Sequence, residues 1–116
     1  MSLFIDHVVI TVADIDKSIH FYSNVLGMEL QEFLSTTDNA KRKSLKFGTQ
    51  KINLHEASKP FKPHAHKPLP GTMDICFLSE INVNDWIKIF DKFDIKIEDG
   101  PAIKTGANGP IKSIYV

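Results

Sequence analysis

Apolar residues recur every second position in some segments of this chain and every three to four positions in others. The first spacing predicts strands and the second predicts helices, so short strands are expected to alternate with helices. Residues 5–12 are rich in β-branched side chains and predict a first strand. Asp14 is a predicted N-cap, because its carboxylate can accept from the free amides of a first helical turn. The next apolar positions share one helical face: Ile15, Ile19, Tyr22, Val25 and Leu26. Gly27 is expected to end this helix.

Three further strands are predicted after the first helix, over residues 29–34, 43–47 and 51–56. The polar residues 35–42 predict a hairpin loop between the first two of these. In the strand at residues 51–56, Ile52 and Leu54 face one way, and Asn53 and His55 face the other. The first half of the chain is therefore predicted to run strand, helix, strand, strand, strand.

The pattern then begins again after a proline-rich segment, residues 58–71. Residues 73–78 predict a strand, and Asn82 predicts the N-cap of a helix. One face of that helix carries Trp86, Ile89, Phe90 and Phe93. Residues 95–98 predict a short strand, a loop rich in glycine and proline follows, and residues 111–116 predict a last strand. This is an internal repeat with a period of about 67–69 residues.

The repeat predicts an α+β domain of two modules, packed as a pair so that their sheets curve around a cleft. Residues 1–57 form the first module, residues 58–71 the linker and residues 72–116 the second module, together one domain. The second module has no counterpart to the strand at residues 51–56. Either the chain is incomplete, or this module is naturally short.

Charge and composition narrow the classes of partner. The 14 basic residues balance 14 acidic ones, so no broad field is expected to attract nucleic acid or an anionic membrane. The run Lys41-Arg42-Lys43 predicts a solvated strand edge. The single cysteine, Cys76, lies among apolar residues and is expected to be buried. No signal peptide or membrane span is predicted, so we expect a cytoplasmic protein.

The candidate chemistry is metal binding. A lone histidine on a strand, such as His7, is most often structural. The repeat sets Asp74 opposite His7, however, and the cleft would bring His55 and Asn53 alongside. Imidazole and carboxylate ligands suit a divalent metal such as Zn, Ni, Co, Fe or Mn. A catalytic site needs about three protein ligands and an open position.

Other histidines are weaker candidates. His64 and His66 lie in the proline-rich segment, which we interpret as a solvated loop; if it folds over the cleft, both would contact substrate. His20 is expected on the outer face of the first helix. No nucleophile–base arrangement is apparent, so no catalytic residue is assigned.

The opening of the chain resembles the vicinal oxygen chelate superfamily, which includes glyoxalase I, extradiol dioxygenases, fosfomycin-resistance enzymes and bleomycin-resistance proteins. The resemblance is carried by the run from Ile5 to Asp14, then by Ser18, Phe21-Tyr22 and Val25-Leu26-Gly27-Met28. It covers nearly the whole chain. Residues 51–56 and 70–76 resemble a glyoxalase-domain, dioxygenase-related branch.

The resemblance implies paired βαβββ modules around a divalent metal, with His7 matching the ligand on the first strand. The ligand on the fourth strand falls at Asn53 or His55, and His55 is chosen as the better donor. The third falls at Asp74, where glyoxalase I usually has histidine. The fourth, a glutamate on the final strand, would lie past Val116.

The function implied is that of a metal-dependent lyase or dioxygenase acting on a small substrate with vicinal oxygens. The alternative is a metal-free binding protein, as bleomycin-resistance proteins are. Dimers often complete the site in this family, so a homodimer is expected.

Overall fold

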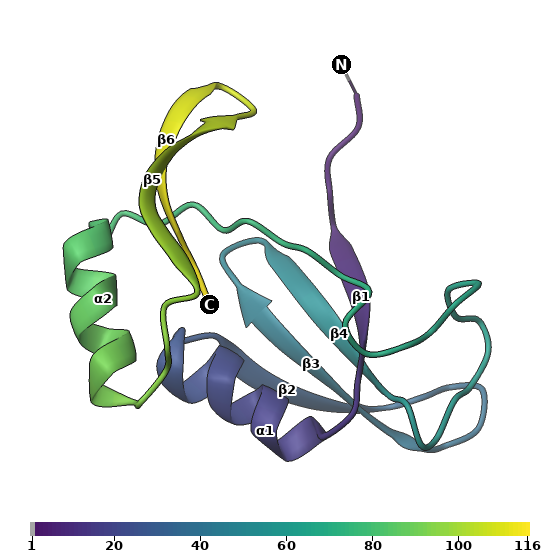
Figure 1. Cartoon of the computed structure of the whole chain (residues 1–116). Coiled ribbons are helices and arrows are strands. Elements are labelled where there is room, and N and C mark those ends of the chain that lie inside the picture. Colours follow the sequence, from purple (N-terminus) through teal and green to yellow (C-terminus); the bar gives the residue numbers. More distant parts are fainter. Residues whose placement is uncertain (1) are drawn as a thin grey trace. The chain divides into compact units, whose positions relative to one another are not determined.

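The computed structural model describes residues 2–116 and divides into two compact units, one ending at Ile75 and the other spanning Cys76–Val116. The first unit begins with β1 (His7–Val12), α1 (Ile15–Ile19) and η1 (His20–Val25). It continues with β2 (Glu29–Leu34), β3 (Lys41–Phe47) and β4 (Gln50–Glu56). This is the predicted βαβββ order, and the mixed α+β class is confirmed (Figure 1).

The four strands form one sheet in the order β1-β4-β3-β2. β1 pairs in parallel with β4, from His7 opposite Lys51 to Val12 opposite Glu56. The β2–β3 and β3–β4 pairs are antiparallel. The parallel pair requires a crossover, and the helical segment between β1 and β2 supplies part of it.

Capping and a glycine set the limits of the first helical segment. The Asp14 side chain accepts from the Lys17 N–H at 3.1 Å, which confirms the predicted N-cap. At the other end the turn widens, and the Leu26 N–H donates to the Phe21 carbonyl at 3.0 Å, five residues earlier. Gly27 then adopts a φ of 86°, a conformation that glycine accepts without steric cost, and ends the segment as predicted.

The core of this unit lies between the sheet and the helical segment (Figure 1). Its buried members come from alternate positions of the strands and from Met28: Ile10, Val12, Met28, Leu45, Ile52 and Leu54. Ile15, Ile19 and Tyr22 of the helical segment pack against them. Side chains alternate between the two faces along β1 and β4. One face is therefore apolar and covered by the helix, and the other face carries most of the polar side chains.

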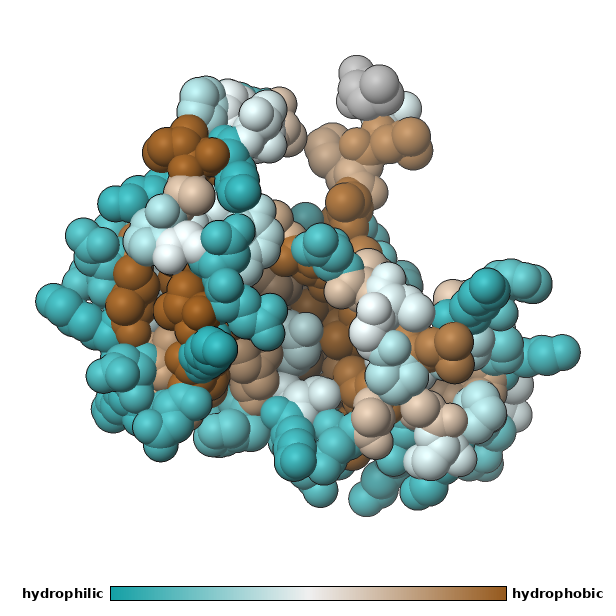
Figure 2. Space-filling view, viewed as in Figure 1, coloured by the Kyte–Doolittle hydropathy of each residue, from teal (hydrophilic) through white to brown (hydrophobic). Residues whose placement is uncertain are grey.

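The segment before β1 is apolar and exposed. Leu3, Phe4 and Ile5 expose most of their side chains, and Figure 2 shows this apolar surface on the stretch that leads into the sheet. The predicted first strand, residues 5–12, is therefore too long at its start, because the paired ladder begins at His7.

The second unit contains α2 (Val83–Lys92), β5 (Asp99–Gly106) and β6 (Gly109–Tyr115). Asn82 caps α2 by accepting from the Asp85 N–H at 2.9 Å, as predicted. The rings of Trp86 and Phe90 stack with centroids 5.6 Å apart, and Phe90 is buried. β5 and β6 form an antiparallel hairpin closed by Ala107 and Asn108.

Two strands predicted in the second half are wrong. Residues 73–78 and 95–98 form no strand. The two sheets of the described residues consist of β1 to β4 and of β5 with β6, and neither includes these segments. The predicted glycine and proline loop instead contains β5 and the start of β6. Pro101 is tolerated because a two-stranded hairpin has outer edges that need no N–H donor, and the register shifts between Asp99 and Ala102. Gly109, the first residue of β6, has a φ of 125°, a conformation that glycine adopts readily.

Cys76 also differs from its prediction, since it is a free, exposed cysteine and not a buried one. No helix of the described residues has the length and apolar character needed to cross a membrane.

Truncating a fully buried core side chain should destabilise the first unit. Leu45 is 0% exposed in the middle of β3, and Leu45→Ala should lower the free energy of unfolding by about 2–5 kcal/mol. Leu34→Ala is the matched control, because Leu34 is 63% exposed, and it should change that free energy by at most about 0.5 kcal/mol. Urea denaturation measures both. Equal losses in the two variants would contradict this placement of the core.

Candidate functional site

The face of the sheet opposite the helix is polar and partly buried. The register places Asn53 of β4 opposite Ser44 of β3 and Val9 of β1. By alternation, Arg42 shares this face with Ser44, and His55 shares it with Asn53. Ser44 is 1% exposed and His55 8% exposed, so these polar side chains are buried without belonging to the apolar core. We call this surface the polar sheet face.

His7 begins the polar sheet face at the first residue of β1. Its Nδ1 lies 2.7 Å from Oδ1 of Asp6, and this hydrogen bond is the main cause that lowers the pKa of the Asp6 carboxyl. The arrangement leaves Nε2 of an exposed imidazole available to a ligand. Histidines that bind metals generally donate their other ring nitrogen to a carboxylate or carbonyl in this way.

Asn53 carries an orphaned polar atom. Its Oδ1 is buried and has no hydrogen-bond partner among the described residues. An unsatisfied buried acceptor costs about 1–3 kcal/mol, and a water, ligand or metal at that atom would recover the loss. Asn53 is therefore a candidate ligand on structural grounds.

His55 has a different environment. Its ring lies against Phe61, with centroids 4.1 Å apart, and the Arg42 guanidinium lies 3.5 Å from the centre of the same Phe61 ring. Burial lowers the pKa of His55, and the charges of Arg42 and His64 lower it further. The lowered pKa favours the neutral imidazole that metal binding requires, but a cation and an aromatic ring occupy its surroundings.

The register of the β1–β4 pair places the two predicted histidine ligands, His7 and His55, far apart along the strands. His7 lies opposite Lys51, whereas His55 lies opposite Thr11. Four residues along a strand span about 13 Å, and two residues span about 7 Å. Two nitrogen ligands of one zinc lie within roughly 4 Å of each other. Asn53, two residues beyond Lys51, is therefore closer to His7 along the strands than His55 is.

The remaining predicted residues are exposed. Asp74 lies near the end of the first unit, directly before Ile75, which packs on the core. His64 and His66 lie in the segment after β4, and Nδ1 of His64 is 2.7 Å from the Ala65 carbonyl oxygen. Within residues 2–116, no three His, Cys, Asp or Glu side chains are grouped closely enough to hold a metal ion.

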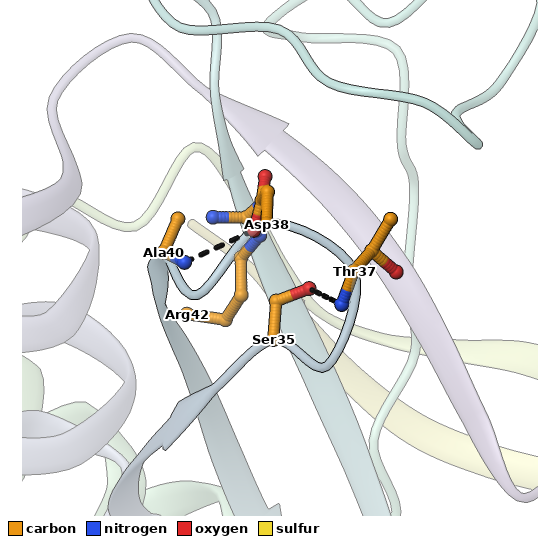
Figure 3. Close-up of polar contacts among 5 residues, drawn as sticks. All are labelled: Ser35, Thr37, Asp38, Ala40 and Arg42. Atoms are coloured by element: carbon orange, nitrogen blue, oxygen red, sulfur yellow. Dashed lines mark hydrogen bonds and ion pairs between the residues drawn. The ribbon is translucent and has the colours of Figure 1, made fainter.

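Arg42 is a site residue that sequence reasoning missed (Figure 3). Its Nη2 donates to Oδ2 of Asp38 at 2.6 Å, and Asp38 also accepts from the Ala40 N–H at 3.0 Å. These two bonds, that to Ala40 first, lower the pKa of the Asp38 carboxyl. The Thr37 N–H donates to Oγ of Ser35 within the same loop. The hairpin loop thus holds the Arg42 side chain in place.

The solvated strand edge predicted for residues 41–43 is wrong at Arg42. Its side chain is 13% exposed, and its Nε is buried with no hydrogen-bond partner among the described residues. Strand alternation, combined with the hairpin register, would have placed Arg42 and Ser44 on the face of Asn53. Nothing in the sequence pattern signalled that Phe61 would cover this face.

The fold and this face define a class: a βαβββ module that presents histidine, amide and guanidinium groups on the side of its sheet opposite the helix. The family model of the "Glyoxalase/Bleomycin resistance protein/Dioxygenase superfamily" matches residues 4–109. The chain belongs to this superfamily.

Two relatives are similar to this chain over nearly its whole length. The chain is 45% identical over 112 residues to "Virulence protein STM3117" of Salmonella typhimurium, covering 97% of this chain and 74% of that protein. It is 46% identical to "Glyoxalase domain-containing protein RDO1" of Mycosarcoma maydis, of whose length it spans only 60%. The crystal structure of STM3117 aligns with a TM-score of 0.88 at 42% identity, covering 100% of this chain and 88% of that one.

A more distant structure supports the fold alone. The fosfomycin resistance protein FosX of Listeria monocytogenes aligns with a TM-score of 0.56 at 16% identity, covering 85% of this chain and 78% of that one.

The lowered pKa of His55 predicts a pH dependence of stability. An unfolded imidazole ionises near a pKa of about 6.5. Below that pH the unfolded chain binds more protons at His55 than the folded chain does, so the free energy of unfolding should fall as the pH drops. Above that pH both states are neutral at His55, and the contribution of His55 to the free energy of unfolding should be fully present. His55→Asn should flatten this dependence below about pH 7.

Urea denaturation at several pH values measures this slope. His20→Asn is the control, because His20 is exposed on η1, and it should keep the slope of the native chain. An unchanged slope in His55→Asn would assign the dependence to another group.

Proposed function

We propose that this chain is a metal-dependent enzyme of the glyoxalase type, which binds a divalent ion at His7 and acts on a small substrate with neighbouring oxygens. The supporting observation is the Asp6–His7 pair. Its 2.7 Å contact engages Nδ1 and leaves Nε2 as the ligand atom. Its position at the start of β1 is the one that the family resemblance assigns to the first ligand.

We propose Asn53, in preference to His55, as the second ligand. Asn53 has a buried amide oxygen that lacks a partner in the described structure, and it is the nearer of the two to His7 along β4. An amide oxygen is a harder donor than imidazole, which favours ions such as Mn or Mg over the softer ones. Asp74 remains the proposed third ligand, as the resemblance implies.

When bound, such an ion supplies Lewis-acid chemistry to substrate oxygens. The chain's own groups would orient the substrate on the polar sheet face. Ser44 lies opposite Asn53, and the Arg42 guanidinium lies beyond it on the same strand. FosX, which shares only the fold with this chain, was solved with Mn(II) and a sulfate ion.

A second candidate function is metal-free binding of a small molecule, as in the bleomycin-resistance branch of the superfamily. The specific observation in its favour is the pair of buried orphan atoms, Asn53 Oδ1 and Arg42 Nε. One is an acceptor and the other a donor, so a neutral polar ligand could satisfy both without an ion. A homodimer and a cytoplasmic location remain predictions from the sequence.

Metal content separates the two functions. After incubation with Mn²⁺ or Zn²⁺ and gel filtration, elemental analysis should find about one ion per chain in the native protein. His7→Ala should lose the ion, because it removes the exposed imidazole ligand. Asn53→Ala should weaken affinity about tenfold or more, as loss of a ligand or its immediate support does. His20→Ala is the control and should bind as the native chain does.

The His55→Ala variant decides between the two candidate ligands of β4. If it retains the ion while Asn53→Ala loses it, Asn53 is the ligand. If the native chain retains no ion under any loading condition, the metal-dependent function is refuted and metal-free binding stands.

A further inference from the structure

The first unit has a hollow at the end of the sheet away from His7. It has a volume of about 460 Å³ and lies where β3 begins and β4 ends. Glu56, at the last position of β4, lines it, whereas His7 lies opposite Lys51, at the second position of that strand. Five residues of strand span about 17 Å, so this hollow is distinct from the proposed metal site.

Cations outnumber carboxylates around the hollow. Four cationic side chains line it: Lys41, Arg42, Lys43 and Lys59. Its two carboxylates are Asp38 and Glu56, and Asp38 already binds Arg42 at 2.6 Å. The hollow therefore has an excess of positive charge in a chain whose formal net charge is zero.

Two of the lysines are available to a ligand. Lys43 lies 3.9 Å from Glu32, a loose ion pair. Lys41 and Lys59 are exposed and form no salt bridge with any described residue. An anion between them would gain two charge-assisted contacts without breaking an existing ion pair.

The rest of the lining is apolar. Ile15, Leu54, Pro60 and Phe61 contribute to it, and Leu54 is part of the core. Small-molecule sites commonly combine an apolar wall with a few charged groups, and volumes of about 300–1,000 Å³ are typical. Phe61 is already held by the Arg42 guanidinium, 3.5 Å from its ring centre, so this wall is preorganised.

We infer that this hollow binds a small organic anion, with its charged group between Lys41 and Lys59 and its apolar body against Phe61 and Pro60. The inference does not rest on the proposed function, because none of the proposed metal ligands lines the hollow. It assigns a binding role to Lys41, the first residue of the basic run at residues 41–43.

Phenyl phosphate is a suitable probe, with inorganic phosphate and phenol as its two halves. The full chain would be titrated in the presence of EDTA, and amide shifts followed by ¹H–¹⁵N NMR. Saturable shifts should centre on Ala40, Lys41 and Lys59. Phenyl phosphate should bind more tightly than either half, since only it engages both the cations and the apolar wall, and its affinity should fall as salt is raised.

Variants assign the contacts. Lys41→Gln and Lys59→Gln should each weaken phenyl phosphate binding about fivefold, the effect of one partly exposed charge. Phe61→Ala should reduce the advantage of phenyl phosphate over inorganic phosphate. Lys17→Gln is the control, because Lys17 is an exposed lysine of α1 outside the hollow, and it should bind as the native chain does.

Three results would overturn the inference. They are the absence of saturable shifts at the hollow, a loss of affinity in Lys17→Gln equal to that in Lys59→Gln, or shifts centred on His7 and Asn53. His7→Ala should retain phenyl phosphate binding, because His7 does not line the hollow. The titration therefore tests the anion site independently of the proposed metal site.

Discussion

The parallel pairing of β1 with β4 is the constraint on which the rest of the first unit depends. It fixes Val9 opposite Asn53 and sets the distance between His7 and every side chain of β4. It also requires a crossover, which places the helical segment over the apolar face. The opposite face carries the polar side chains, which follow one another every second residue, or about 7 Å, along each strand.

Because successive side chains of a strand point to opposite faces, β3 and β4 place apolar side chains on one face of the sheet and polar side chains on the other. Leu45, Ile52 and Leu54 form the core on one side. Ser44, Asn53 and His55 lie on the other side and are partly or fully buried, and the Phe61 ring lies against His55. Burying polar groups is unfavourable unless they are satisfied, and Oδ1 of Asn53 has no hydrogen-bond partner among the described residues.

Arg42 links this face to the basic hollow. Its guanidinium contacts Asp38 and Phe61, while its neighbours Lys41 and Lys43 line the hollow with it. A planar, permanently charged group suits this position because it can stack on an aromatic ring and pair with a carboxylate at once. One arginine thereby holds a loop, a ring and a strand end together.

The sequence by itself determined the local features: both helix caps, the end at Gly27, the βαβββ order, and which of Ile52, Asn53, Leu54 and His55 share a face. These depend on periodicity and on capping chemistry within a few residues of chain. Only the tertiary structure decided that His7 and His55 are four positions out of register, that Phe61 covers His55, and that residues 73–78 form no strand. Each of these depends on contacts between segments distant in sequence, and no turn between neighbouring strands sets the register of the parallel β1–β4 pair.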